Sequence, residues 1–568
     1  MSSDSYAEIC KTIYARIMRK LVTGHEERRR FAPIGATQEV LQPKILRRFF
    51  RSLELVADET TDEVDLNEDS LIKRMGERNL YNFLAILIFA SCTIDAARTF
   101  TIKLLARNSW PEHLGTRPAE RKELIDLFEE EITPDQFLSQ QACFHPVVIE
   151  NKKEVQIQSL DRQCLPYLEE RLRGKGSFGT VYQVKIAKGN FLDAEFGANK
   201  EPKDIARKDY QFSKNHRPKE EHEIMKKILA SDRTCANIVD IYGSLAIGLT
   251  KYIVFMPLAI CDLRAYMMED LRIGPNANME KTAIILSASG LAGGLAFLHH
   301  EMRTVEGEEM VCYHMDLKPS NILIFLEGKE DHQQFIWKIS DFGMSRVKLR
   351  SKGQKGTREK DFDSWFVRFQ KPQDASAPSG TLNRRGEGTY LGPESLAPTR
   401  DMRTANDVWS LGCVISVVFA YLEEGRSGVT KYQEQRLEYR NAEGYDRFFI
   451  ANARFGYPKV HPEVSQWHRH LIKKARQRDS KEADAVESML GYLERKVLLP
   501  EQSKRCNVKQ LQAKLVETYQ KYRDLKDISN EHTPEDQSGM SGAPWNKIIS
   551  RQHLPWKQNG HNRRKTQQ

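Results

Sequence analysis

HMDLKPSN, residues 314–321, is followed by DFG at residues 341–343. This stretch contains the groups that phosphoryl transfer requires. They are an aspartate, a lysine two positions later and an asparagine three positions after the lysine. Asp316 can orient an attacking hydroxyl, while Asn321 and Asp341 can hold magnesium against the phosphates of a nucleotide. Isolated acidic and amide residues are common, but this order and spacing are hard to obtain by chance. The two stretches therefore predict a site for phosphoryl transfer.

A glycine-rich turn lies upstream, in RGKGSFGTVY at residues 173–182. Glycines 174, 176 and 179 have the spacing of a loop that covers phosphates, although the same spacing also opens dinucleotide-binding helices. Residues 180–184, TVYQV, are β-branched or aromatic except for Gln183, so they predict a strand after the turn. This pattern favours a β-hairpin over the nucleotide rather than a dinucleotide-binding fold.

Further motifs occur in a matching order. Residues 205–208, IARK, resemble a VAIK motif; residues 392–394, GPE, resemble APE; and residues 406–412, NDVWSLG, resemble DVWSLG. With these motifs the chain resembles the eukaryotic protein kinases of the serine/threonine type over about residues 167–520. Lys318 favours serine and threonine as acceptors, and dual specificity stays open.

The resemblance implies an α+β, two-lobed protein kinase fold within residues 155–525. A small β-rich lobe of five strands and one key helix would span residues 165–257, and a larger helical lobe residues 258–525. The activation segment would run from 341 to 394, which is long for a loop in a compact domain. It is rich in lysine and arginine, so we expect a solvated, mobile segment.

The resemblance also implies the roles of the site residues. Asp316 would position the substrate hydroxyl and accept its proton, Lys318 would steady the γ-phosphate, and Asn321 and Asp341 would bind two Mg²⁺ ions. The residues implied to contact ATP are Gly174, Gly176, Ser177, Phe178, Gly179, Val181, Ala206, Lys208, Glu221, Met256, Leu258 and Leu323.

The lysine that holds the α and β phosphates is expected to be Lys208, which follows the small Ala206 in a strand-like run. Lys200 and Lys203 remain alternatives, because the connection from about 188 to 204 is long and its register is hard to fix.

The partner of this lysine is expected to be a glutamate on a helix with an apolar stripe. Glu221 has the matching position, and Glu220 and Glu223 stay possible. The stripe consists of Ile224, Met225 and Ile228, which have helical spacing.

Residues 252–255 have the pattern of a buried strand, and Met256-Pro257-Leu258 that of its exit. By resemblance Phe255 would be the gatekeeper at the back of the nucleotide site, and residues 256–258 would face adenine.

Two further residues have structural roles in the resemblance. Glu394 is expected to pair with Arg505, and Asp407 to anchor the backbone of the 314–316 turn. Such features distinguish a protein kinase from a small-molecule phosphotransferase, which is a weaker alternative.

Two residues depart from the family pattern. Met315 replaces the arginine that would pair with a phosphorylated activation segment. Glu387 stands where relatives place a threonine beside the catalytic aspartate, although Thr389 could serve instead. These departures support one rival, a kinase-like scaffold (pseudokinase) that binds nucleotide or partners without efficient transfer.

Residues 1–150 are not explained by the kinase resemblance. Their helical periodicity predicts a small all-α domain, and it is clearest at Ile9, Ile13 and Ile17 and again from 71 to 105. The role of this domain is unknown, and a regulatory partner could bind to it. The polar composition of residues 526–568 predicts a disordered tail.

The composition fits an intracellular enzyme of the cytoplasm or nucleus. The chain has 568 residues, of which 40% are hydrophobic and 29% charged, and a net charge of +9, which does not by itself indicate nucleic acid binding. Nine scattered cysteines without a CxxC motif predict reduced thiols. No signal peptide is expected, and the longest apolar run, residues 83–92, is too short for a membrane span.

Overall fold

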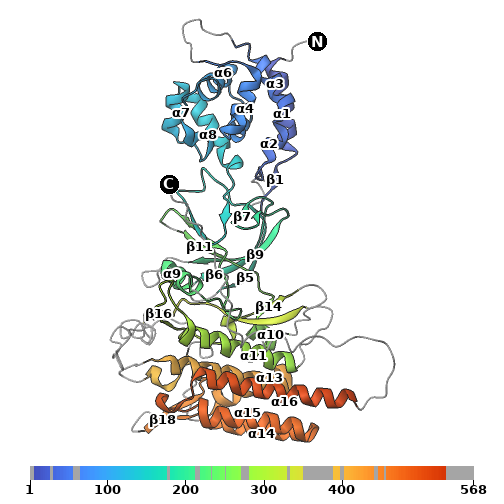
Figure 1. Cartoon of the computed structure of the whole chain (residues 1–568), viewed down its shortest axis with the longest axis vertical. Coiled ribbons are helices and arrows are strands. Elements are labelled where there is room, and N and C mark those ends of the chain that lie inside the picture. Colours follow the sequence, from blue (N-terminus) through green and yellow to red (C-terminus); the bar gives the residue numbers. More distant parts are fainter. Residues whose placement is uncertain are drawn as a thin grey trace, which may run out of the picture.

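The chain stacks a helical unit, a β-sheet and a second helical region along its longest axis in the computed structural model (Figure 1). The helical unit lies on the side of the sheet away from the second helical region. The residues that the structure describes are 5–25, 30–55, 64–175, 179–210, 218–231, 233–249, 251–269, 281–328, 333–349, 388–396, 402–439, 446–452 and 456–531.

The N-terminal unit is helical, as predicted, and has its own core. Ile9, Ile13 and Ile17 are completely buried on one face of the first helix, and Ser5 with Glu8 forms its capping box. The apolar run beginning at Phe83 is a core helix that is buried on nearly every side. The helices are α1 (Tyr6–Met18), α2 (Ala36–Val40), α3 (Pro43–Ser52), α4 (Glu68–Glu77), α5 (Tyr81–Phe89), α6 (Ile94–Phe100), α7 (Arg121–Phe128) and α8 (Ile132–Phe144).

A six-stranded sheet follows, in the order β4-β10-β11-β9-β6-β5. The expected small lobe has five strands, so β4 is an addition that the resemblance did not predict. It pairs in parallel with β10, whose residues are all buried and whose outer edge would otherwise lack a backbone partner. The strands are β4 (Lys153–Ile157), β5 (Tyr167–Lys175), β6 (Gly179–Ile186), β9 (Lys203–Tyr210), β10 (Gly243–Ile247) and β11 (Lys251–Met256).

Two short β-structures connect the helical unit to this sheet. A hairpin of β1 (Val22–Thr23) and β2 (Arg30–Phe31) extends from the helical unit, and the backbone N–H of His25 donates to the carbonyl of Tyr167 at 2.8 Å. The long connection before β9 also forms regular structure. Its strands β7 (Phe191–Asp193) and β8 (Gly197–Ala198) form a small sheet with β3 (Ile149–Glu150).

The second helical region contains the largest core, which also includes the inner face of the sheet. The α+β class and the two-lobed arrangement are therefore confirmed. The remaining helices are α9 (Pro218–Leu229), α10 (Leu263–Met268), α11 (Lys281–Ala296), α13 (Thr404–Glu438), α14 (Pro462–Arg478), α15 (Ser480–Tyr492) and α16 (Val508–Glu531). The remaining strands are β12 (Cys261–Asp262), β13 (Met310–Tyr313), β14 (Ile322–Glu327), β15 (Gln334–Ile339), β16 (Arg346–Leu349), β17 (Phe449–Asn452) and β18 (Gly456–Val460).

The helix α16 corrects one predicted boundary. It continues to Glu531, whereas the polar tail was expected to begin at 526. Leu511, Leu515 and Tyr519 form a buried stripe on its inner face, and the polar residues that follow are compatible with further helical turns. Residues 532–568 and most of the predicted activation segment lie outside the described residues.

Within the described ranges, two helical stretches are long and apolar enough to cross a membrane by length and composition. They are Lys281–Glu301 and Thr404–Glu438, and 72% and 89% of their most apolar windows are buried inside the protein. Burial of this extent is typical of core helices in folded domains.

Candidate active site

The loop from His314 to Asn321 connects β13 to β14 and is held from below by α13. The carboxylate of Asp407 accepts the backbone N–H groups of His314 at 2.9 Å and of Met315 at 2.8 Å. These two bonds hold Met315 at a φ of 67°. Residues other than glycine rarely adopt this left-handed backbone conformation without such support. The predicted role of Asp407 as the anchor of this turn is confirmed.

Asp407 itself is buried and remains an acceptor. Burial alone would raise its pKa, but the bond of its Oδ2 to His299 Nε2, at 3.0 Å, and the backbone donors lower the pKa below its ordinary value. The anchoring carboxylate is therefore charged when it holds the loop.

Asp316 lies at the centre of a small polar cluster. Lys318 Nζ is 2.7 Å from Asp316 Oδ2, and Asn321 Nδ2 donates to the same oxygen at 3.0 Å and to the Asp316 carbonyl at 2.8 Å. Burial raises the pKa of Asp316 above its ordinary value, Lys318 opposes this effect, and the charge of Asp341 adds to it. The structure thus brings the three predicted residues of the loop into contact.

Asp341 joins this cluster to the sheet. Its Oδ1 is 3.0 Å from Lys208 Nζ, and its φ of 61° is again unusual for a residue other than glycine. Burial would raise the pKa of Asp341, but Lys208 and, more weakly, Lys318 lower it below the ordinary value. The ion pair joins the sheet to the large lobe directly above the loop.

The neighbours of Asp341 fix its backbone. The carbonyl of Ser340 is 3.0 Å from His314 Nε2, and the ring of Phe342 meets that of His314 edge-on at a centroid distance of 5.1 Å. Ser340 also bonds the carbonyl of Asn321 through both its N–H and its hydroxyl, each at 2.9 Å. The loop and the DFG segment therefore form one hydrogen-bonded unit.

The geometry favours Lys208 over the two alternative lysines. Lys208 lies on β9 with its side chain 9% exposed. Lys200 is exposed, and Lys203 lies over the rings of Phe191 and Tyr242, at 3.8 and 4.2 Å from their centroids. Only Lys208 of these three contacts an acidic residue of the loop cluster in the described structure.

The helix expected to carry the glutamate partner is α9. Its predicted stripe of Ile224, Met225 and Ile228 is buried, as expected. Glu223 is 58% exposed and lies 3.2 Å from Lys226, so its side chain faces solvent. The side chains of Glu220 and Glu221 lie outside the described residues.

The prediction that Phe255 is the gatekeeper is wrong. Phe255 pairs with Arg207 and belongs to the core on the outer face of the sheet, away from Lys208. Met256 pairs with Ala206 on the inner face and packs against the core of the large lobe. The run YIVFM is apolar throughout, so the sequence gives no alternation that would reveal which residues face inward.

The other residues predicted to contact the nucleotide lie around this inner face. Gly174 and Val181 pair across the β5–β6 hairpin, and Leu323 lies on β14 next to Asn321. A side chain at Gly179 would place its Cβ 2.4 Å from the carbonyl of Asp209, so the close approach of β9 requires glycine there. Gly176, Ser177 and Phe178 lie outside the described residues, and Leu258 is half-buried just beyond β11.

A methionine cluster beside the loop was not predicted. Met315 is 6% exposed and Met402 1%, and Tyr313, Met344 and Leu391 pack around them. The sequence reveals only that an arginine is replaced at 315. The proximity of the three methionines depends on the fold, because they lie far apart in the chain. Thr389, the possible substitute for the family threonine, is buried, and Glu387 lies outside the described residues.

The predicted pair of Glu394 and Arg505 is confirmed. Arg505 Nη1 and Nη2 lie 2.7 and 2.8 Å from the two carboxylate oxygens of Glu394, and both side chains are almost completely buried. Arg505 also lies over Trp409, with its Cζ 4.8 Å from the ring centroid. The Glu394–Arg505 pair links the end of the predicted activation segment to the helical lobe.

The two lobes, the loop cluster and the lysine of β9 together define a protein kinase fold. Residues 167–514, more than half of the chain, match the protein kinase domain, and the chain belongs to that family.

Several curated proteins are similar to a part of the chain. Serine/threonine-protein kinase CDG1 of Arabidopsis thaliana is 32% identical over 251 residues, which cover 44% of this chain and 45% of that protein. Mitogen-activated protein kinase kinase kinase YODA, from the same organism, is 27% identical over 179 residues, with coverages of 32% and 15%. Protein SUPPRESSOR OF NPR1-1 CONSTITUTIVE 4, also from Arabidopsis, is 28% identical over 175 residues, with coverages of 31% and 13%. The chain therefore spans less than half the length of each of these relatives.

Proposed function

We propose that this chain is an active protein kinase that transfers the γ-phosphoryl group of ATP to serine and threonine hydroxyls of protein substrates. The observation that carries the proposal is the connected cluster of Asp316, Lys318 and Asn321, together with the Lys208–Asp341 ion pair above it.

The donor set fits a divalent cation and a nucleotide. Asn321 uses its amide nitrogen for both bonds to Asp316, so its Oδ1 is the atom available to an ion. Asp341 has a carboxylate that is one-quarter exposed and charged at neutral pH. Carboxylate and amide oxygens are the ligands that Mg²⁺ uses in proteins, and two ions are proposed here. The cation, when bound, would neutralise the charge that develops on the phosphates.

The protein residues would act mainly by positioning and by charge. Asp316 would accept a hydrogen bond from the substrate hydroxyl and take its proton late in transfer. Lys318, now paired with Asp316, would reach the γ-phosphate, and Lys208 would hold the α and β phosphates. Glu221 on α9 is proposed to support Lys208.

We propose that the catalytic domain begins at about residue 155, as the sequence predicts, and extends to the end of α16 at Glu531. The helical unit would bind a regulatory partner. An intracellular setting, cytoplasm or nucleus, is proposed from the composition alone.

Replacing Lys208 with methionine is expected to abolish phosphate incorporation into myelin basic protein, because the ion pair with Asp341 and the phosphate contact are both lost. The variant should still fold, since methionine fills a similar volume. Initial rates of radiolabel transfer measure the effect. Lys200→Met is the matched control, because Lys200 is exposed, and it should keep wild-type activity. Equal activity in the two variants would contradict the proposed role of Lys208.

The rival function is a pseudokinase, and Met315 is the observation that favours it. A thermal shift with ATP, with and without Mg²⁺, combined with an autophosphorylation assay separates the two. Mg²⁺-dependent stabilisation together with transfer supports the kinase, whereas stabilisation without transfer supports the scaffold.

We expect basal activity to be insensitive to phosphatase treatment. The position that pairs with a phosphorylated segment in relatives is occupied here by Met315, which is buried against Met402 and Met344. Apolar contacts of this kind do not depend on a phosphate group. Activity is measured before and after treatment with a broad-specificity phosphatase, which is then removed. Loss of most of the activity would show that this account of regulation is wrong.

A further inference from the structure

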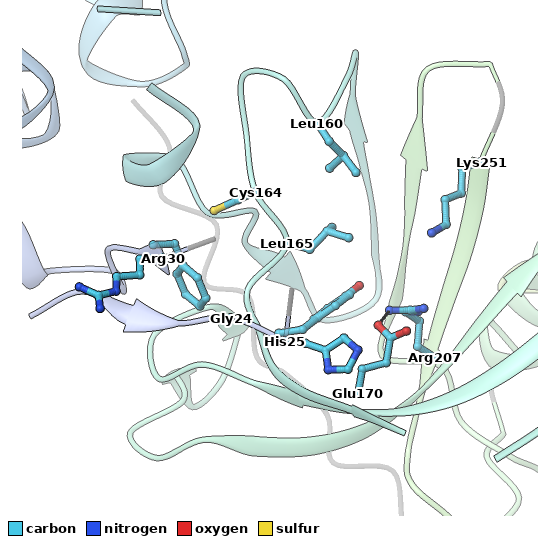
Figure 2. Close-up of a pocket in the computed structure, with 11 residues that line it drawn as sticks. Gly24, His25, Arg30, Leu160, Cys164, Leu165, Glu170, Arg207 and Lys251 are labelled. Carbon is cyan, nitrogen blue, oxygen red and sulfur yellow. Dashed lines mark hydrogen bonds and ion pairs between the residues drawn. The ribbon is translucent and has the colours of Figure 1, made fainter. Parts of the chain in front are cut away.

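A cavity of about 340 Å³ lies between the N-terminal hairpin and the outer face of the sheet (Figure 2). Its walls come from three parts of the chain: the β1–β2 hairpin, the segment before β5, and the strands β5, β9 and β11. This size is within the range of small-molecule sites in proteins.

The cavity is separate from the proposed active site. Arg207 lines it, while the next residue, Lys208, contacts Asp341 on the other face. Successive side chains of a strand point to opposite faces of a sheet, so the cavity lies behind the phosphate-binding position. A ligand here would not compete directly with a nucleotide.

Arg207, Lys251 and Glu170 form the floor of the cavity, and Asp209, which does not line it, balances their charge. Arg207 donates to Glu170 at 2.5 Å and to the two oxygens of Asp209 at 2.7 and 3.1 Å, and Lys251 pairs with Asp209 at 3.1 Å. Two cationic side chains, Arg207 and Lys251, therefore pair with two carboxylates.

The side toward the hairpin adds positive charge. Arg30 and His25 also line the cavity, and Glu170 is the only acidic residue in its described lining. Figure 2 shows the guanidinium of Arg30 turned away from the centre and His25 lying beside Glu170. The lining residues Arg30, Arg207, Lys251 and Glu170, together with the Asp209 carboxylate that pairs with two of them, sum to one positive charge, so a monoanion complements them.

One buried hydroxyl at the cavity lacks an acceptor. Tyr167 is 4% exposed, the Arg207 guanidinium lies over its ring, and its hydroxyl proton has no acceptor within the described structure. A buried hydroxyl without a partner is costly, so such groups in native proteins are usually satisfied by a ligand or water. The hydroxyl can donate to an acceptor placed in the cavity.

The remaining wall is apolar. Leu160, Leu165 and Phe31 line it, and Phe31 belongs to a small buried cluster with Cys164 and Ala187. An apolar body would fit against this side while an acidic group meets the Tyr167 hydroxyl.

We propose that this cavity binds a small amphipathic carboxylate, with its acidic group at the Tyr167 hydroxyl and its apolar part against Leu160 and Leu165. Such a ligand would join the helical unit to β5, the strand that leads into the glycine-rich turn. The hydrogen bond from the His25 N–H to the Tyr167 carbonyl already connects the same two parts.

Calorimetric titration of the full chain with 3-phenylpropionate and with its neutral amide tests the proposal. The carboxylate is expected to bind at least about tenfold more tightly than the amide, because a charge-assisted hydrogen bond is stronger than a neutral one. Tyr167→Phe removes the hydroxyl but keeps the ring, and it should remove most of that preference.

Leu160→Trp tests the location, because the larger side chain fills the cavity and should weaken both ligands. The exposed Leu249→Trp is the matched control and should change neither affinity. The thermal shift that ATP produces should be the same in all variants, which reports that they are folded. The proposal is overturned if neither compound binds, if the two bind equally, or if Leu160→Trp leaves their affinities unchanged.

Discussion

Replacing Asp316 with asparagine is expected to lower the rate of phosphoryl transfer by a factor of about 10²–10⁴, the usual contribution of a positioned proton acceptor. Asparagine has nearly the same size, so the loop should keep its anchors to Asp407. The substitution removes the carboxylate that pairs with Lys318 and that would accept the substrate proton. Initial rates of radiolabel incorporation into myelin basic protein measure the effect.

The control for this variant is Asp484→Asn, which makes the same chemical change at an exposed position on α15. Its transfer rate should equal that of the wild type. The ATP-induced thermal shift of Asp316→Asn should remain, because Lys208 and Asp341 are unchanged. A transfer rate within twofold of the wild type would contradict the role of Asp316.

Replacing Arg505 with alanine is expected to lower the free energy of unfolding by about 3–5 kcal/mol, because one partner of a buried ion pair is removed and Glu394 is left charged and buried. Arg505 also donates to the carbonyls of Leu499 at 2.7 Å and Ala405 at 2.9 Å, so three segments lose a common partner. Urea unfolding followed by circular dichroism measures the change.

The neighbouring Lys504 provides a matched control. It lies 2.7 Å from Glu501, but the two side chains are 69% and 58% exposed. Exposed pairs contribute little, so Lys504→Ala should change the free energy of unfolding by less than about 1 kcal/mol. Similar losses in the two variants would mean that the Glu394–Arg505 contact does not support the lobe as described.

Short motifs predicted the parts of the site that are local in sequence. The spacing within HMDLKPSN places Asp316, Lys318 and Asn321 in one loop, and the structure brings them within hydrogen-bond distance. The contacts of Asp407 and Arg505 are distant in sequence, and they were predicted only through the family resemblance. Physical patterning alone would not have paired them.

The predictions that were wrong or missing concern features that depend on three-dimensional packing. The orientation of Phe255 could not be read from an apolar run, because both faces of that strand are buried. The additional strand β4 is short and mixed in character, and it pairs along the open edge of β10, which the sequence does not reveal. The cavity behind Arg207 also depends on the hairpin of the helical unit, whose position no motif predicts.

The most direct test of the central claim is to incubate the full chain with Mg²⁺-ATP and myelin basic protein, and to identify the modified residues by mass spectrometry. We expect phosphoserine and phosphothreonine in the wild-type reaction, and at least about a hundredfold less of both in the Asp316→Asn reaction over the same time. ATP binding by the wild type without any phosphorylated residue would contradict the account and identify the protein as a nucleotide-binding scaffold.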